Sequence, residues 1–392
     1  MQMRGTGRLL EWRARRFSDP VERLQFLKSK LSGGAAPGFL ANRSLKHVRM
    51  SFIALGLALA TTTLLQPFAK RALGLAPPEI RSVARTAAPR MVANTSQQPA
   101  TAPPVWLVET KQHFDLYSNG LRVENEFLTS NVPRKYLAFS SERPDSAAGE
   151  WRTNPAGIVF HTTESHMAPF EEDQNQSLKR DGEGLLQYVS RRKSYHFVID
   201  RFGRVFRVVA ESDSANHAGN SVWADQHFVY LNLNESFFGV AFEARSRQDA
   251  DGEPVNAAQV HAARILTEML RARYGIASSN CVAHAQVSVN PANRRAGYHT
   301  DWAANLPFTA LGLTDNYSHP LPSVTLFGFE PDAGLADAGG APLAAGIQAS
   351  EDKIRDDAAA HGLPAERYRA ALQKRYKDSI QALRAPFRRT IK

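Results

Sequence analysis

Four stretches in the middle of the chain carry apolar patterns typical of β-strands. Residues 157–163 (GIVFHTT) and 237–244 (FFGVAFEA) are continuous apolar runs, which predict buried strands. Residues 194–200 (SYHFVID) alternate between apolar and polar positions, and residues 204–209 (RVFRVV) follow after the turn RFGR. These last two segments are therefore expected to form a hairpin.

A long amphipathic helix is predicted from Asn256 to Tyr274. Asn256 can cap its first turn, Gln259 occupies the capping-box position, and Gly275 ends it. Because strand and helix patterns alternate through this part of the chain, we expect an α/β fold with a central mixed β-sheet flanked by helices. The apolar face of the helix is formed by Val260, Ile265, Leu266, Met269 and Leu270.

Residues 350–392 show a second helical pattern and are expected to form a C-terminal helical extension. Ser350 begins one helix that ends at Gly362, and Pro364 begins another that ends at Pro386. One apolar stripe favours packing against the main domain; a partner-binding or membrane-surface segment is the alternative. The stripe consists of Tyr368, Leu372, Tyr376, Ile380 and Leu383.

Residues 50–69 are uncharged and mostly apolar, and Lys70 and Arg71 close the run. About 20 such residues are long enough to cross a bilayer as a helix, so we expect an N-terminal transmembrane signal-anchor. The basic segment 1–49, with eleven Lys or Arg against three Asp or Glu, is expected to stay in the cytoplasm. A signal peptide cleaved near residues 58–60 and a buried helix of a soluble domain are the alternatives.

These patterns divide the chain into seven parts. Repeated prolines before residue 105 exclude a packed helix there and indicate an extended linker. The parts are the basic cytoplasmic segment (1–49), the anchor (50–69), a Pro/Ala-rich linker (70–104), an N-terminal extension of the main domain (105–149), the main domain (150–315), a loop-rich connection (316–349) and the helical tail (350–392).

Composition and charge narrow the classes of function. Apolar residues make up 43% of the 392 residues, enough for a sizeable core, and the net charge is +10. Most of this excess lies in residues 1–49, so the main domain is not expected to bind nucleic acid. The single cysteine, Cys281, excludes an intramolecular disulfide and a CxxC metal cluster.

Several histidines lie where predicted strands end. His161 ends the run GIVF, and His284 follows a short apolar run, CVA, after the long helix. His299 and Asp301 lie in the segment GYHTDW, and His217 lies in the small-residue loop NHAGNS. A catalytic zinc ion needs three protein ligands and an open position for water. His161, His284 and Asp301 would meet that count.

An ordered set of motifs resembles the type-2 N-acetylmuramoyl-L-alanine amidases, which share a fold with the peptidoglycan recognition proteins. The motifs are FHTTES, SYHFVIDRFGRVFRVV, NHAGN, FFGVAFE, VAHAQVSVNP and GYHTDW, and they span about residues 150–310. The resemblance implies a Zn²⁺ cofactor held by His161, His284 and Asp301. It places His299 where the family has a catalytic lysine. Because the loop before Asp301 is longer than usual, His299 is also an alternative third ligand.

The resemblance also implies residues that contact substrate. The hairpin motif matches Tyr195 and His196, and the family's Trp-His-Ala-Gly loop matches a segment that begins with Asn216 and His217, with Asn in place of Trp. We expect His217, Asn216 and His196 to bind substrate.

The proton-transfer residue departs from the family pattern. The catalytic glutamate of some family members corresponds to Ala241, and Glu243 lies two positions later on the same strand face. Glu243 and Glu164 are therefore the catalytic candidates. A structural role for Glu243, paired with Arg245 or Arg207, is the alternative.

The implied function is zinc-dependent hydrolysis of the amide bond between N-acetylmuramic acid and L-alanine in peptidoglycan. A non-catalytic peptidoglycan-binding module and a zinc peptidase acting on stem peptides are the alternatives. We expect a monomer whose anchor (50–69) lies in the inner membrane and whose catalytic domain faces the periplasm or the outside; secretion after signal cleavage is the other possibility.

Overall fold

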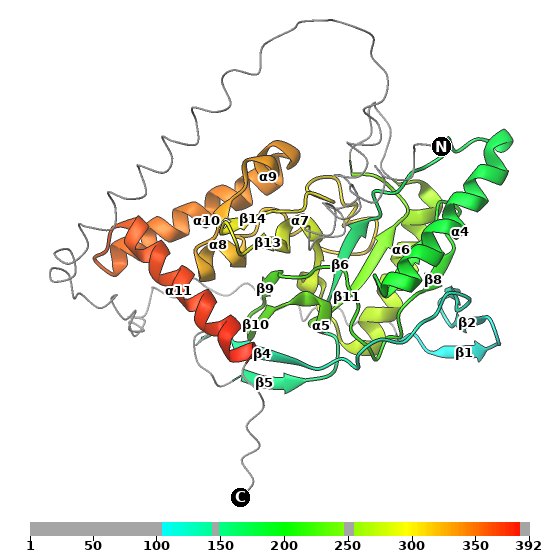
Figure 1. The fold of residues 1–392 in the computed structure, drawn as a ribbon, viewed down its shortest axis with the longest axis horizontal. Coiled ribbons are helices and arrows are strands. Elements are labelled where there is room, and N and C mark those ends of the chain that lie inside the picture. Colours follow the sequence, from blue (N-terminus) through cyan, green and yellow to red (C-terminus); the bar gives the residue numbers. More distant parts are fainter. Residues whose placement is uncertain (1–103, 143–148, 247–254, 385–392) are drawn as a thin grey trace, which may run out of the picture. The chain divides into compact units, whose positions relative to one another are not determined.

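An eight-stranded mixed β-sheet forms the centre of the fold (Figure 1). The computed structural model describes residues 104–142, 149–246 and 255–384. The strand order is β1-β2-β3-β8-β7-β11-β6-β12, and β7, β11, β6 and β12 are parallel to one another. This sheet confirms the predicted α/β class. Its strands are β1 (Leu107–Thr110), β2 (Phe114–Tyr117), β3 (Arg122–Glu124), β6 (Gly157–Thr162), β7 (Phe197–Ile199), β8 (Val205–Arg207), β11 (Phe237–Phe242) and β12 (Cys281–Ala283).

The four predicted strands are all present. All residues of β6 and β11 are buried, as continuous apolar runs predict. β7 and β8 pair antiparallel with Phe197 opposite Arg207, which confirms the hairpin. β6 and β11 pair in parallel with His161 opposite Ala241. Paired residues on neighbouring strands share a face, so His161 and Ala241 lie on the same side of the sheet.

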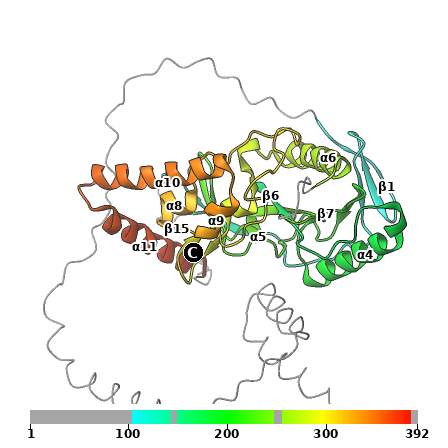
Figure 2. The same cartoon turned by 90° about the horizontal axis from the view of Figure 1, so that it is seen from above.

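Two long helices cover opposite faces of the sheet (Figure 2). On one face, α6 (Ala257–Tyr274) packs with side chains such as Phe160 and Val240. On the other face, α4 (Asn175–Arg192) packs with Ala241. The capping box of α6 forms as predicted, since the Asn256 side chain accepts from the Gln259 N–H; Gly275 ends the helix at φ +67°.

A smaller antiparallel sheet packs beside the main one. Its strand order is β5-β4-β10-β9. Val159, Val282 and Phe237 share an apolar cluster with its side chains. Its strands are β4 (Tyr136–Ser140), β5 (Gly149–Arg152), β9 (Val222–Ala224) and β10 (Phe228–Leu231). Short helices elsewhere in this part of the chain are η1 (Glu172–Gln174), α5 (Leu233–Ser236), η2 (Ser278–Asn280) and α7 (His284–Val287).

The predicted N-terminal extension, residues 105–149, supplies strands to both sheets. β1, β2 and β3 widen the main sheet, and β4 belongs to the smaller one. A buried ion-pair network fastens this extension: the Arg207 guanidinium lies 2.6 Å from Asp115 on β2 and 2.7 Å from Glu211. Its second terminal nitrogen donates to the Tyr117 hydroxyl at 3.0 Å.

The C-terminal part is helical over more of its length than predicted. The loop-rich connection expected at 316–349 is wrong, because this range contains two short helices, one strand and the start of a third helix. Helix α10 begins at Ala341 rather than Ser350, since Pro342 is tolerated in a first helical turn and Gly346 packs closely on the backbone of Tyr317. The elements are β13 (Val289–Asn290), β14 (Arg295–Ala296), α8 (Pro322–Phe327), β15 (Glu330–Pro331), α9 (Ala333–Ala338), α10 (Ala341–Ala360) and α11 (Ala365–Arg384).

Helix α11 packs against the rest of the domain through the predicted stripe. Tyr368, Leu372 and Tyr376 are buried, and they belong to the same core cluster as Phe160 of the central sheet. The favoured prediction, packing on the domain, is confirmed. A third sheet, β13-β14-β15, joins the hairpin β13–β14 to this helical region.

The predicted N-terminal segments lie outside the described residues. They are the basic segment 1–49, the anchor 50–69 and all but the last residue of the linker 70–104; the helix end at Pro386 is outside as well. Among the described residues, no helix is both long enough and apolar enough to span a bilayer.

Candidate functional site

Two adjacent parallel strands bring His161 and His284 to the same level of the sheet. His161 is the fifth residue of β6, and His284 directly follows β12. In the register of these strands, Ala283 is opposite Phe160, so the next residues, His284 and His161, lie side by side. Their ring centroids are 4.4 Å apart, and both side chains are buried.

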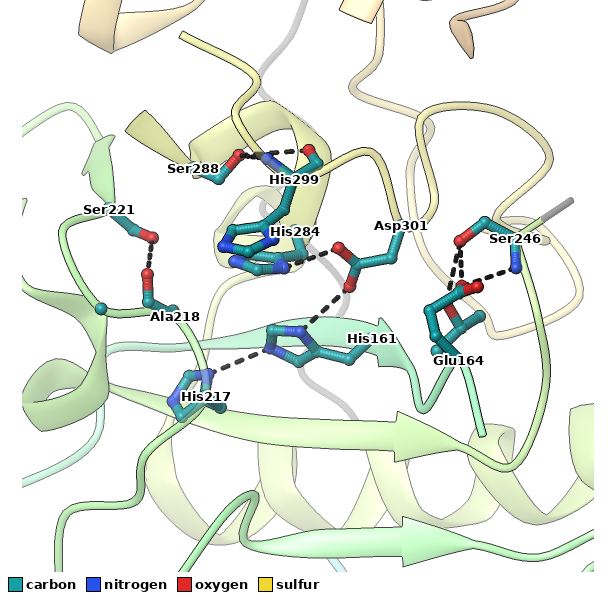
Figure 3. Close-up of polar contacts among 12 residues, drawn as sticks. His161, Glu164, His217, Ala218, Ser221, Ser246, His284, Ser288, His299 and Asp301 are labelled. Atoms are coloured by element: carbon teal, nitrogen blue, oxygen red, sulfur yellow. Dashed lines mark hydrogen bonds and ion pairs between the residues drawn. The ribbon is translucent and has the colours of Figure 1, made fainter. Parts of the chain in front are cut away.

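The Asp301 carboxylate lies between the two imidazoles (Figure 3). One carboxylate oxygen is 2.7 Å from Nδ1 of His284, and the other is 3.2 Å from Nδ1 of His161. One potential ligand atom from each of the three residues lies within 4.8 Å of the others. Burial alone would raise the pKa of Asp301, but the groups that lower it, His284 first among them, outweigh burial and hold that pKa well below its usual range.

His217 fixes the orientation of His161. Its Nε2 is 3.2 Å from the Phe237 carbonyl, which only accepts, so Nε2 carries the proton. Burial lowers the pKa of His217 well below its usual value, so the ring is neutral and its Nδ1 is an acceptor. That acceptor lies 3.1 Å from Nε2 of His161, which therefore donates to it. The remaining nitrogen of His161, Nδ1, then presents a lone pair to Asp301.

The loop that carries His217 is held by a residue that the sequence patterns did not single out. The side-chain oxygen of Asn234 accepts from the backbone N–H groups of His217, Ala218 and Gly219 at 2.8, 2.7 and 2.9 Å. Gly239 of β11 lies against the His217 ring, and a Cβ at this position would lie 2.5 Å from Cγ of His217. A glycine is therefore required where this imidazole rests on β11.

The other predicted substrate contacts differ in their exposure. Asn216 is exposed and donates to the carbonyl of Arg192 at 3.0 Å. His196 is 0% exposed, its Nδ1 accepts from the Gly239 N–H at 3.0 Å, and its Nε2 lies 3.0 Å from the Asp213 carbonyl. His196 thus sits in the wall behind His217 and does not reach solvent.

His299 lies next to the three residues but outside their close group. Its ring stacks on His284 with centroids 4.9 Å apart and planes inclined by 19° (Figure 3). Both its backbone N–H and its carbonyl bond to the hydroxyl of Ser288. Of the two predicted candidates for the third ligand, Asp301 is the one grouped with both histidines.

Comparison with known proteins decides the family. Residues 151–301 match the model of the N-acetylmuramoyl-L-alanine amidase family Amidase_2, and these residues contain His161, His284 and Asp301. This part of the chain belongs to the type-2 amidase family. The match supports an amidase-type function on peptidoglycan. No curated protein sequence matches the chain.

Three of the solved structures that are similar to this chain come from two bacteria and an insect. AmpDh3 from Pseudomonas aeruginosa, solved in complex with anhydromuramic pentapeptide, is 22% identical, with 58% of this chain and 91% of that chain covered and a TM-score of 0.31. The amidase LysC from Clostridium intestinale is 19% identical, covering 47% and 93%, with a TM-score of 0.26. Drosophila peptidoglycan recognition protein SD is 17% identical, covering 41% and 84%, with a TM-score of 0.25.

The two candidate catalytic glutamates of the amidase domain are both held by hydrogen bonds. Glu243 is buried, and one of its oxygens accepts from the Arg201 N–H at 3.2 Å. The predicted partners Arg245 and Arg207 are wrong: the former donates to a carbonyl, and the latter belongs to the network on β2. Burial raises the pKa of Glu243.

Glu164 follows β6 and turns toward Ser246 (Figure 3). One of its oxygens accepts from the Thr162 hydroxyl at 2.5 Å and from the Ser246 N–H at 2.7 Å, and also from the Ser246 hydroxyl. Its backbone has φ +49°, which is uncommon for a residue with a side chain. Glu164 is thus fixed beside the site with its carboxylate directed at Ser246.

Tyr195 is a further side chain at the site. Its ring centroid lies 5.1 Å from that of His161. Burial, Asp301 and Glu164, in that order, raise the pKa of its hydroxyl, which keeps the group protonated at neutral pH. Tyr195 belongs to the hairpin motif, but the alternating pattern of that segment does not reveal that the backbone of Tyr195 turns to φ +61°.

The donor set fits a zinc ion. Burial, followed by the neighbouring His284, lowers the pKa of His161 to about 4, so the ring is neutral at pH 7. Its Nδ1 lone pair then faces a carboxylate oxygen at 3.2 Å, an arrangement that a cation relieves. Nε2 of His284 is also buried without a hydrogen-bond partner. Two imidazoles and one carboxylate form a ligand set that catalytic zinc sites use.

Proposed function

We propose that this protein is a zinc-dependent N-acetylmuramoyl-L-alanine amidase that cuts the amide bond between N-acetylmuramic acid and L-alanine of peptidoglycan. One observation carries the proposal: the Nδ1 lone pair of His161 faces the Asp301 carboxylate, and His284 lies beside them. All three residues lie in the segment that matches the amidase family. Zinc bound by these three residues would supply Lewis acidity to the scissile carbonyl and to the attacking water.

The surrounding residues prepare the three ligands. Nδ1 of His217 accepts a hydrogen bond from the Nε2–H of His161, which leaves Nδ1 of His161 as the coordinating atom. His299, stacked on His284 at the edge of the group, is positioned to donate a hydrogen bond to an oxyanion that forms there. The protonated hydroxyl of Tyr195, whose ring lies beside His161, is a second candidate donor.

Proton transfer between water and the leaving amine requires a group that holds a proton near neutral pH. Glu243 and Glu164 are the two carboxylates we propose for this role. The raised pKa of Glu243 favours Glu243 as the proton carrier. Glu164 is favoured by its place beside the three candidate ligands (Figure 3). The variants Glu243→Gln and Glu164→Gln separate them, because only loss of the transferring group should lower kcat with zinc content preserved.

The test of the function combines zinc analysis with product analysis on intact sacculi. Wild type should retain about one zinc per chain and release peptides with a free N-terminal L-alanine. His161→Ala and Asp301→Ala should lose zinc, and His299→Ala should keep zinc but lose turnover. Shortened stem peptides would instead identify a zinc peptidase, and absence of zinc from wild type would sink the proposal.

A non-catalytic peptidoglycan-binding module is the second candidate. It is favoured by Ala241, which occupies the position of the family's catalytic glutamate and packs in an apolar cluster with Leu186 of α4. Co-sedimentation with sacculi separates the two functions. A protein that binds sacculi tightly and holds zinc, but releases no L-alanyl peptide, is a binding module.

We further infer that residues 50–69 anchor the chain in the inner membrane and that the amidase domain faces the periplasm or the outside. The support is the uncharged, mostly apolar run between two basic flanks. Protease added to spheroplasts should degrade the domain while the membrane is intact. Complete protection of the domain would contradict the inferred topology.

A further inference from the structure

Ser288 bonds to both backbone polar groups of His299. Its hydroxyl oxygen accepts from the His299 N–H at 3.0 Å and donates its proton to the His299 carbonyl at 3.2 Å. Ser288 is only 2% exposed, so water does not replace either hydrogen bond easily. One buried hydroxyl thus holds a segment that lies eleven residues later in the chain.

Ser288 is itself held in a rigid frame. Its N–H donates to the carbonyl of His284 at 3.0 Å, which ties it to the candidate ligand at the end of β12. Its carbonyl accepts from the Gly297 N–H at 2.8 Å, and its backbone forms an antiparallel bridge with Ser221. The hydroxyl therefore has a fixed position relative to His284.

The hairpin β13–β14 closes the chain between Ser288 and His299. The C-terminal region supports the hairpin from outside: Arg294 at its tip donates to Gln373 of α11 at 2.7 Å, and β15 pairs with β14. Gly297, at φ +79°, lies against Leu335 of α9, where a Cβ would approach within 2.4 Å. Through these contacts, the C-terminal region holds the β13–β14 hairpin in place, and with it His299, which follows the hairpin.

We propose that Ser288 is a positioning residue that sets the imidazole of His299 over His284. The inference rests on the proposed function, in which His299 acts beside the three ligands. The hydroxyl of Ser288 holds both the N–H and the carbonyl of His299. It therefore fixes the position and direction of the Cα–Cβ bond from which the imidazole extends. The parallel stacking of the two rings is the result.

The test uses three variants of the full chain. Ser288→Ala removes both hydrogen bonds, and Ser288→Thr restores the hydroxyl. Ser350→Ala is the matched control: Ser350 is equally buried, and its hydroxyl likewise accepts from one backbone N–H, that of Leu321, and donates to one carbonyl, that of Gly346, within the C-terminal helices. All three are compared with wild type by histidine-selective NMR of the metal-free protein and by amidase kinetics.

Stacking shifts the ring-proton resonances of His299, so Ser288→Ala should move them while Ser350→Ala leaves them in place. With zinc bound, Ser288→Ala should lower kcat about 10-fold, because misplacement by a fraction of an ångström disturbs a transition-state contact. KM and zinc affinity should stay within about twofold, and Ser288→Thr should recover most of kcat. Unchanged His299 resonances in Ser288→Ala, or an equal loss of kcat in Ser350→Ala, overturns the inference. Should wild type prove inactive, the proposed function fails, whereas the NMR comparison still decides the positioning role.

Discussion

Replacing His217 with phenylalanine tests whether this ring sets the metal-binding nitrogen of His161. Phenylalanine keeps an aromatic ring over Gly239 but removes the acceptor that lies 3.1 Å from Nε2 of His161. The His161 N–H is then buried without a partner, which costs about 1–3 kcal/mol unless the ring turns and moves its lone pair away from Asp301. Loss of such a partner typically lowers metal affinity about 10- to 100-fold.

That range corresponds to about 1.4–2.8 kcal/mol of binding free energy. The assay is a competition titration of zinc against a chromophoric chelator, at pH 7.5, for wild type and His217→Phe. The control is His227→Phe, because His227 is exposed in the turn between β9 and β10 and its ring lies beside Phe228. A zinc affinity for His217→Phe within twofold of wild type, or an equal loss in His227→Phe, would refute the role assigned to His217.

Three further predictions concern stability. In the metal-free protein, the pKa of His161 is about 4, against about 6.5 in an unfolded chain, because burial penalises the charged ring. The unfolded chain therefore binds the proton first as pH falls, and urea titrations should show about 3 kcal/mol of stability lost between pH 6.5 and 4 from this group. Gly239→Ala should destabilise by about 1–3 kcal/mol through overlap with the ring above it. By contrast, Gly184→Ala, on the exposed face of α4, should stabilise by about 0.5–1 kcal/mol. Arg207→Ala breaks a buried network and should cost about 3–5 kcal/mol, whereas Arg122→Ala, at an exposed pair, should cost under about 1 kcal/mol.

Each of these has an outcome that contradicts it. Stability that rises as the pH is lowered from 6.5 to 4 would contradict the burial of a neutral His161. Equal effects of the two glycine substitutions would mean that the contact over β11 is loose. Hydrogen exchange should show β1–β3 opening in Arg207→Ala, and unchanged protection of these strands would mean that other contacts fasten the extension.

The elements that the sequence predicted are those with strong local signals. The helix after Asn256 has a complete capping box and a terminal glycine, and the structure reproduces both ends. Helix α4 has no such signals: it contains two glycines and buries only Leu178, Gly182, Leu186 and Val189 along 18 residues. Its stability comes from packing on the sheet, which a periodicity cannot reveal.

The site divides in the same way. The sequence predicts His161 and His284 as site residues because each lies where a predicted strand ends. The carboxyl ends of parallel strands lie at the same edge of the sheet. The choice between Asp301 and His299 was open, because both follow the same insertion, and only the folded hairpin determines which side chain enters between the imidazoles. Asn234 was not identified because its three hydrogen bonds go to a loop that is distant in sequence.

The shared core makes the folding unit larger than the segment that matches the amidase family. One cluster runs from Tyr117 through the central sheet to Tyr376 of α11, while the family match ends at residue 301. A chain stopped at 301 would lose Trp302, whose buried ring packs against Phe242 of β11, and would lose the contact of Leu335 with Gly297. A chimeric protein that carries this domain therefore has to include α8–α11. A boundary at residue 301 would divide the hydrophobic core between two proteins.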